Sequence, residues 1–263
     1  MPASLRPIAR RFATRLRGWT VVLVHPRPTR SWFATALATV TVVGILYFFA
    51  AVTAEELLRP LYDPVQRTIS ELAIGPFGFL QTSAFVALGL SLLALQHALY
   101  RRLRHTLASK VALALLGVCG LLSFAAAIFP TDLRGAVVTA AGTVHELAAS
   151  VGYAGLIIAM ILLSLHFRRD ERWRAFAGPS TGLAVLGVFT SIFMGATSHT
   201  DVSGLSQRLM VVPLLSWVVW TALHARTTHA TPVAATASPE TLRDDDQHRP
   251  QLQRSPRPPF ENR

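Results

Sequence analysis

Residues 32–54 read WFATALATVTVVGILYFFAAVTA, an apolar run without a single charged side chain. In a helix this run would extend about 35 Å, enough to cross the ~30 Å hydrocarbon layer of a bilayer. Helices are expected rather than open strands, because an unpaired strand edge in lipid leaves backbone groups without partners. Five further apolar runs of similar length follow, at residues 78–100, 111–129, 145–167, 180–198 and 209–225. The pattern predicts an all-α polytopic integral membrane protein, a bundle of six transmembrane helices.

The composition supports lipid as the solvent. Of the 263 residues, 51% are hydrophobic and only 15% are charged, whereas a soluble domain carries about 25% charged residues. The net charge of +11 does not indicate nucleic acid as a partner, because the basic residues are sorted by loop. The expected partners are membrane lipids.

The distribution of basic residues predicts the orientation. Of the 25 lysines and arginines, 21 lie in residues 1–30, 101–110, 168–174 and 226–263. The other loops hold only four, namely Arg59, Arg67, Arg134 and Arg208. Because loops rich in Lys and Arg stay in the cytoplasm, both termini are predicted to be cytoplasmic, in a multi-pass protein of the cell membrane.

Three segments are expected along the chain. Residues 1–30 form a basic cytoplasmic leader, residues 31–226 form the six-helix transmembrane domain, and residues 227–263 form a cytoplasmic tail. The tail is rich in Thr, Ala, Pro, Asp and Arg, so it cannot bury enough apolar surface to fold and is predicted to be disordered. The single cysteine, Cys119, lies midway along the third apolar run and is interpreted as a packing residue.

The largest loop on the predicted outer side begins after residue 54. Within it, Asp63-Pro64-Val65-Gln66 is typical of a helix start, with Asp as the cap and Pro in the first turn. A short helix ending near Gly75 is therefore predicted at the outer surface.

Polar and ionisable residues gather at this same outer end of the predicted bundle. All three helical hairpins contribute: Asp63, Arg67, Ser70, Glu71, Asp132, Arg134, His145, Glu146, His199, Asp201, Gln207 and Arg208. Ionisable groups at membrane level suggest a functional site, since desolvating each one costs energy unless it is paired. A purely structural reading stays open, because Thr143 to Glu146 fits a capping box and residues 63, 67 and 71 have ion-pair spacing.

One candidate chemistry is a zinc site. Asp132, His145 and His199 could be three ligands that leave a position for water, with Glu71 or Glu146 as the base. No HExxH motif or close histidine pair supports this set. No cofactor is therefore expected, with zinc kept open as a possibility.

A second candidate is nucleophilic catalysis. Ser70 could be activated by His145, with Asp132 or Asp63 orienting the imidazole. No Gly-x-Ser-x-Gly sequence surrounds Ser70. A third candidate needs no covalent chemistry: the three outer arginines Arg67, Arg134 and Arg208 could bind a lipid phosphate.

Several short motifs resemble those of a six-span family known as domain of unknown function 998. The motifs run in order as Tyr62-Asp63-Pro64, Ile69-Ser70-Glu71-Leu72-Ala73, Gly75-Pro76-Phe77-Gly78, Phe129-Pro130-Thr131-Asp132, Gly142 with His145, and Gly204-Leu205-Ser206-Gln207-Arg208. The resemblance covers roughly residues 32–225 and implies the same six-helix fold. It carries over Asp63, Ser70, Asp132, His145, Gln207 and Arg208, but not His199 or Asp201, which weakens the zinc set. The family has no settled activity, so the resemblance implies no substrate.

The sequence thus favours a non-catalytic protein whose outward-facing polar pocket binds a lipid or an amphipathic small molecule, for transport or as a scaffold. The expected ligand-binding residues are Asp63, Arg67, Glu71, Gln207 and Arg208. The alternative is a membrane-embedded lipid hydrolase or transferase that uses Ser70, Asp132 and His145, with or without a metal ion.

Overall fold

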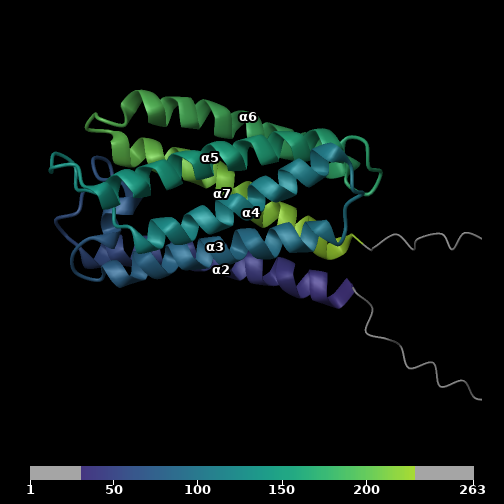
Figure 1. Cartoon of the computed structure of the whole chain (residues 1–263), viewed down its shortest axis with the longest axis horizontal. Coiled ribbons are helices and arrows are strands. Elements are labelled where there is room, and N and C mark those ends of the chain that lie inside the picture. Colours follow the sequence, from purple (N-terminus) through teal and green to yellow (C-terminus); the bar gives the residue numbers. More distant parts are fainter. Residues whose placement is uncertain (1–30, 229–263) are drawn as a thin grey trace, which may run out of the picture. The chain divides into compact units, whose positions relative to one another are not determined.

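The computed structural model describes residues 31–228, and this part of the chain is helical, without strands (Figure 1). Six α-helices and one 3-10 helix follow one another: α2 (Ser31–Leu58), η3 (Ile69–Ala73), α3 (Gly78–Tyr100), α4 (Leu107–Ile128), α5 (Ala140–Phe167), α6 (Arg174–Thr197) and α7 (Ser203–Thr227). The predicted all-α fold is confirmed. The predicted basic leader, and the predicted tail beyond Thr228, lie outside the described residues.

All six α-helices are long and apolar enough to cross a membrane. Large apolar side chains also point outward from them, for example Leu121 (60% exposed), Phe189 (66%) and Ile192 (65%). A helix that is apolar on its outer face as well as its inner face needs lipid around it. The chain is therefore a multi-pass membrane protein.

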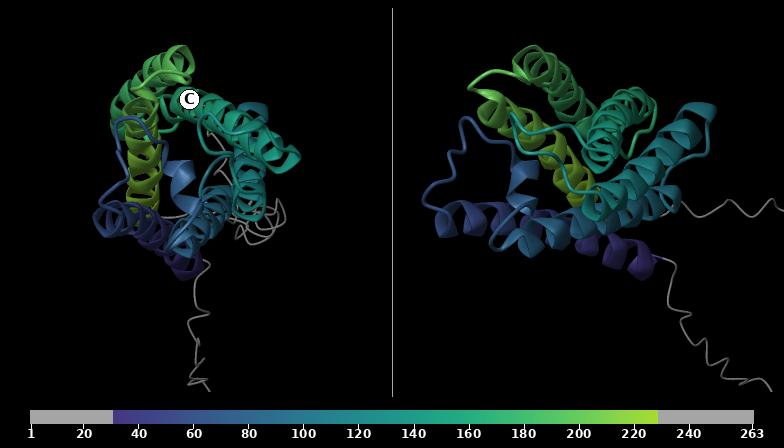
Figure 2. Two further views of the ribbon diagram at one scale, coloured as in Figure 1. Left: turned by 90° about the vertical axis from the view of Figure 1, so that its left-hand side faces the viewer. Right: turned by 60° about the vertical axis from the view of Figure 1, so that its left-hand side comes forward.

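The six α-helices form a closed ring. Each packs against the next along the chain, and α7 packs against α2, so the ring runs in chain order (Figure 2, left). Among the described helices, the only contacts between helices that are not neighbours in the ring are those of α7 with α3 and with α5. The interior is consequently lined by side chains from several helices, and both cavities described below lie there.

The loops lie alternately at two ends of the bundle (Figure 1). We call one the Ser70 end, formed by the loops at residues 59–77, 129–139 and 198–202. The other, the Trp173 end, is formed by the loops at residues 101–106 and 168–173, and both limits of the described segment lie there.

Small residues allow α3 and α4 to approach closely. A Cβ atom on Gly89 would lie 2.8 Å from the Gly120 carbonyl oxygen, and one on Gly120 would lie 3.0 Å from the Gly89 carbonyl oxygen. Between α2 and α3, the Thr41 hydroxyl donates to the Ser91 carbonyl oxygen at 3.1 Å. Such small-residue contacts and side-chain hydrogen bonds hold helices together where lipid surrounds them.

An aromatic cluster closes the Trp173 end. Trp173 is fully buried and stacks on Phe167 with ring centroids 4.5 Å apart. The His224 ring lies 4.8 Å from that of Trp173, and its Nε2 is 3.1 Å from the Arg172 carbonyl oxygen. Hydrogen bonds from the Arg172 guanidinium, which pairs with Asp170 at 2.8 Å, lower the pKa of the Asp170 carboxyl.

Most helices extend beyond the predicted apolar runs. The run at 78–100 coincides with α3, but α5 begins at Ala140 rather than at residue 145. Its N-cap is Thr139, whose hydroxyl accepts from the Gly142 N–H at 3.0 Å. The capping box proposed at residues 143–146 is therefore wrong, since those residues lie within the helix. Polar capping turns interrupt hydropathy but not the helix, which is why the runs were too short.

Candidate functional site

The long loop between α2 and α3 is fastened to the start of α7. The Ile69 N–H donates to Gln207 Oε1 at 2.6 Å, and the Ser203 hydroxyl donates to the Gln66 carbonyl oxygen at 2.8 Å. Gln207, predicted as a ligand-binding residue, thus also holds the loop in place.

Asp63, predicted as the cap of a helix start, begins a turn instead. Its Oδ1 accepts from the Val65 N–H at 2.8 Å, and its side chain is exposed. The predicted helix to Gly75 is nevertheless broken into a turn and the 3-10 helix η3. The physical reason is that the Ile69 N–H bonds to Gln207 rather than to the preceding backbone. Two residues between η3 and α3 are left-handed, namely Gly75 (φ 90°), where glycine suits this conformation, and Phe77 (φ 66°), the N-cap of α3.

Arg208 is used inside the protein as a clamp. Its guanidinium contacts Glu56 Oε1 at 2.5 Å (Nη2) and 3.0 Å (Nε). It also donates to the Tyr62 hydroxyl at 2.9 Å and to the Arg67 carbonyl oxygen at 3.0 Å. Burial raises the pKa of Tyr62, so this hydroxyl stays protonated and donates to the Thr68 carbonyl oxygen at 2.7 Å.

Arg59 forms a second clamp that the sequence reasoning missed. It donates to the carbonyl oxygens of Ile74 at 2.8 Å and Leu72 at 2.7 Å, and it pairs with Glu55 at 3.1 Å. The only signal in the sequence is the four-residue spacing of Glu55 and Arg59, which come directly after the first apolar run.

Asp132 closes the loop between α4 and α5. Its two carboxylate oxygens accept from the N–H and the hydroxyl of Thr139, each at 2.8 Å. Gly142 is required beside it, because a Cβ atom there would overlap the Asp132 carboxylate. Asp132 makes no hydrogen bond to His145 within residues 31–228, so the predicted acid and imidazole are not paired.

His145 is 2% exposed, and its imidazole is oriented by backbone carbonyls. Its Nδ1 lies 2.8 Å from the Phe129 carbonyl oxygen and 3.1 Å from that of Ala126. Both partners are acceptors, so Nδ1 carries a proton, and in the neutral ring Nε2 is an acceptor. Nε2 is buried and has no hydrogen-bond partner among residues 31–228. The orienting role predicted for Asp132 is thus filled by the end of α4.

A polar cavity of about 590 Å³ lies at the Ser70 end, between α5, α6, α7 and the adjoining loops. Its polar and ionisable lining residues include Thr68, Ser70, Glu71, Asp132, Arg134, His145, Glu146, Ser191, His199 and Gln207. The structure therefore brings Ser70, Asp132, His145, Glu71 and Gln207 to one space. Asp63, Arg67 and Arg208 do not line it.

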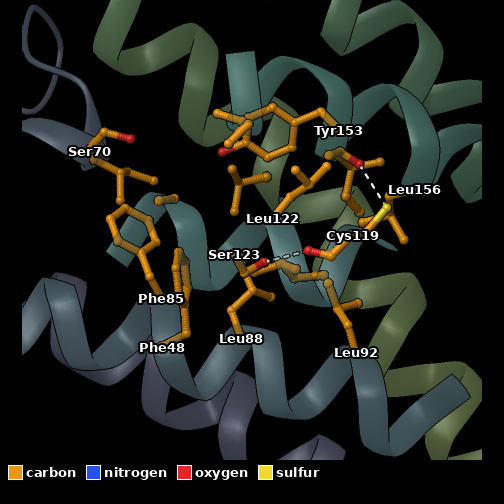
Figure 3. A pocket seen from close by; sticks show the side chains of 18 of the residues that line it. Phe48, Ser70, Phe85, Leu88, Leu92, Cys119, Leu122, Ser123, Tyr153 and Leu156 are labelled. Atoms are coloured by element: carbon orange, nitrogen blue, oxygen red, sulfur yellow. Dashed lines mark hydrogen bonds between the residues drawn. The ribbon is translucent and has the colours of Figure 1, made fainter. Parts of the chain in front are cut away.

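A smaller apolar pocket of about 60 Å³ lies deeper in the ring. Its lining is mostly aromatic and aliphatic, including Phe48, Phe85, Leu88, Leu92 and Leu122 (Figure 3). Cys119 also lines it, is buried, and its thiol donates to the Gly152 carbonyl oxygen at 3.2 Å.

The polar cavity and the apolar pocket share part of their lining, namely Ser70, His145, Ala149 and Tyr153. In Figure 3 the hydroxyls of Ser70 and Tyr153 point toward each other at the top of the apolar pocket. Tyr153 was not predicted. Its signal in the sequence is the four-residue repeat of positions 145, 149 and 153, which places them on one face of α5.

Glu71 is the most buried acid of the polar cavity, with 5% of its surface exposed. Burial raises the pKa of its carboxyl, and the hydrogen bonds from Thr68 and the charge of Arg67 oppose this shift. The Arg67 Nε lies 3.6 Å from Glu71 Oε2, too long for a hydrogen bond. Glu71 therefore stays incompletely compensated inside the protein.

The three predicted zinc ligands do not form a metal site. No three His, Cys, Asp or Glu side chains within residues 31–228 are grouped so that they could hold a metal ion. The Asp132 carboxylate accepts a hydrogen bond from Thr139, and the His145 imidazole bonds to backbone carbonyl oxygens. His199 is exposed in the loop between α6 and α7.

The three predicted phosphate-binding arginines are not gathered either. Arg208 pairs with Glu56, and Arg134 pairs with Asp201 at 3.0 Å. Arg67 has its guanidinium toward Glu71. Of the three, only Arg134 lines the polar cavity.

Fold and site together define a multi-pass membrane protein whose ring of six helices encloses a polar cavity joined to an apolar pocket. The chain belongs to the DUF998 family: the family described as "Protein of unknown function (DUF998)" matches residues 42–224, which include every predicted site residue. The expected family is thus confirmed. No curated protein and no solved structure matches the chain.

Proposed function

We propose that this protein binds an amphiphilic molecule in the membrane, with its polar group in the polar cavity and the first part of its alkyl chain in the apolar pocket. The role is binding, for transport or as a scaffold, rather than covalent chemistry. A ligand site with an apolar lining and a few converging polar groups suits such a molecule.

The observation that carries the proposal is the shared lining of the two spaces. Ser70, His145 and Tyr153 border both the polar cavity and the apolar pocket. A molecule lying across them would place its headgroup beside hydroxyls and imidazole and its chain beside Phe85 and Leu122. Water could fill the polar cavity, where it finds hydrogen-bond partners, but not the apolar pocket.

We also propose that the protein lies in the cell membrane with the Trp173 end in the cytoplasm. The two loops at this end carry Arg101, Arg102, Arg104, Arg168, Arg169 and Arg172, and basic loops are retained in the cytoplasm. The polar cavity would then open toward the cell exterior.

The test blocks the passage between the two spaces. Ala149 lies in the shared lining, so Ala149→Phe should fill it. Val151 is on the same helix but 47% exposed on its outer face, so Val151→Phe is the matched control. Purified protein is titrated in turn with dodecanol, dodecylamine and dodecyl phosphate in a neutral detergent, and bound molecules are counted by native mass spectrometry. The probe that wild type binds most tightly is then used for the variants.

Wild type and Val151→Phe should each retain the probe, and Ala149→Phe should lose it by about tenfold in affinity, or 1.4 kcal/mol. The melting temperature of each variant shows whether it is folded. No retention by wild type, or equal retention by folded Ala149→Phe, contradicts the proposal.

One observation favours acyl transfer as a second candidate. His145 carries its free acceptor at Nε2, the state of a general base, and Ser70 borders the same two spaces. A fluorophosphonate probe labels activated serines, so covalent labelling of wild type that disappears in Ser70→Ala would favour a lipid hydrolase or transferase. Absence of labelling in wild type would count against it.

A further inference from the structure

The charged residues that line the polar cavity are mostly acids. Within residues 31–228 the carboxyl and guanidinium side chains of the lining are those of Glu71, Asp132, Glu146 and Arg134. Arg134, the one guanidinium among them, is already compensated, because its Nη2 lies 3.0 Å from Asp201 and 3.2 Å from the His199 carbonyl oxygen. The cavity thus has a negative surplus.

The other arginines of the Ser70 end cannot offset this surplus inside the cavity. Arg59 and Arg208 are clamps on Glu55 and Glu56, and neither lines the cavity. Arg67 is 47% exposed and only 3.6 Å from Glu71 at its closest.

Two of the buried cavity-lining groups without partners in residues 31–228 are acceptors, and the third, the Ser191 hydroxyl, can donate or accept. Glu71 Oε2 and His145 Nε2 are buried and have no hydrogen-bond partner among residues 31–228. Glu146 makes no ion pair within the same part of the chain and is exposed at the cavity. Unpaired buried acceptors are costly, and a ligand that donates N–H bonds would satisfy them.

We infer that the bound amphiphile carries a protonated amine headgroup, with its N–H groups directed at Glu71 and His145 and the first part of its alkyl chain in the apolar pocket. This inference rests on the proposed function and specifies its ligand. An ammonium supplies both the positive charge and the donors that the cavity lacks. A phosphate headgroup would meet three carboxylates and one arginine that is already paired, and like charges repel at such distances.

The test compares three probes with the same chain and different headgroups: dodecylamine, dodecyl phosphate and dodecanol. Each is titrated at neutral pH against the full-length protein in a neutral detergent, and binding is measured by native mass spectrometry. Dodecylamine should bind at least about tenfold more tightly than dodecyl phosphate, equal to about 1.4 kcal/mol.

The preference should disappear in the double variant Glu71→Gln, Glu146→Gln, which keeps the shape of both side chains. Glu171→Gln is the control, because it removes an exposed acid at the Trp173 end. The double variant must also retain its helical circular dichroism and melting temperature, so that a lost preference is not a lost fold.

The outcomes separate the inference from the proposed function. Equal or tighter binding of dodecyl phosphate overturns the amine headgroup while amphiphile binding stands, and failure of all three probes overturns both. Nanodiscs with phosphatidylethanolamine and phosphatidylglycerol then identify the source, because both lipids have a phosphate and only one has an amine. Selective retention of phosphatidylethanolamine indicates a membrane lipid, retention of dodecylamine alone indicates a free amine, and selective retention of phosphatidylglycerol contradicts the inference.

Discussion

At the scale of single residues, His145, predicted as a catalytic group, has a structural role in the folded protein. Its Nδ1–H satisfies the carbonyls at the end of α4, which fixes the ring and leaves Nε2 toward the cavities that it lines. The sequence predicted that Asp132 orients His145, but the Asp132 carboxylate accepts from Thr139 instead.

His145→Ala should destabilise the protein by about 1–3 kcal/mol, since two buried carbonyl oxygens lose their donor. Thermal unfolding of purified protein in detergent measures this. His199→Ala removes an exposed imidazole from the same end and should leave the melting temperature nearly unchanged. Equal stability of His145→Ala and wild type would mean that the imidazole serves function alone.

Glu71 makes stability depend on pH. Because burial raises its pKa in the folded protein above the ordinary 4.5, the folded state holds this proton more tightly than the unfolded chain. Glu71 thus favours folding below its ordinary pKa, and that contribution is lost as pH rises through the raised pKa.

Glu71→Gln should therefore gain in melting temperature relative to wild type as pH rises from about 4 to about 7. The solvent-exposed Glu171→Gln should show no such trend. A wild-type protein that gains stability over Glu71→Gln with rising pH would contradict the assigned burial of this carboxyl.

At the scale of elements, the helices are defined by hydropathy and their spacing by small residues. Gly120 and Gly117 lie on the same helix, yet only Gly120 faces α3. A Cβ atom at Gly120 would meet Leu93 Cγ at 2.9 Å and the Gly89 carbonyl oxygen at 3.0 Å, whereas one at Gly117 would meet nothing within 4 Å.

Gly120→Ala should lower the free energy of unfolding by about 1–3 kcal/mol, because a backbone carbonyl must move to admit the methyl group. Gly117→Ala, its matched control, should be neutral or stabilising by up to about 1 kcal/mol, since alanine favours the helix. The melting temperatures of the two variants, measured in the same detergent, test this difference. If both variants behave alike, α3 and α4 are not in the close contact described.

At the scale of the whole molecule, the closed ring explains why one end can hold a cavity. Helices α5 and α7 approach each other only slightly, and α6 bridges them. The loops at residues 59–77 and 129–139 are fastened over this end by Arg59, Arg208 and Asp132. Several polar residues of the Ser70 end thus fasten loops to helices, and others face the polar cavity.

The orientation can be tested with single cysteines, because the native Cys119 is buried. Val137 is 86% exposed in a Ser70-end loop, and Glu171 is exposed at the Trp173 end. Val137→Cys should react with a membrane-impermeant maleimide on intact cells, and Glu171→Cys only after permeabilisation. Wild type controls for background. The reverse pattern would place the Trp173 end outside and contradict the charge rule.

Hydropathy and charge placement are properties of the linear chain, so the sequence alone determined the helical class, the membrane location, the six spans and which polar residues share an end. The partners were decided only by the tertiary structure. Gln207 bonds to Ile69, His145 to the end of α4, and Arg208 to Glu56. Each partnership joins different helices or loops of the chain. Because many side chains could make chemically equivalent hydrogen bonds, the local sequence does not show which partner each residue takes. The joined cavities exist only because the ring closes.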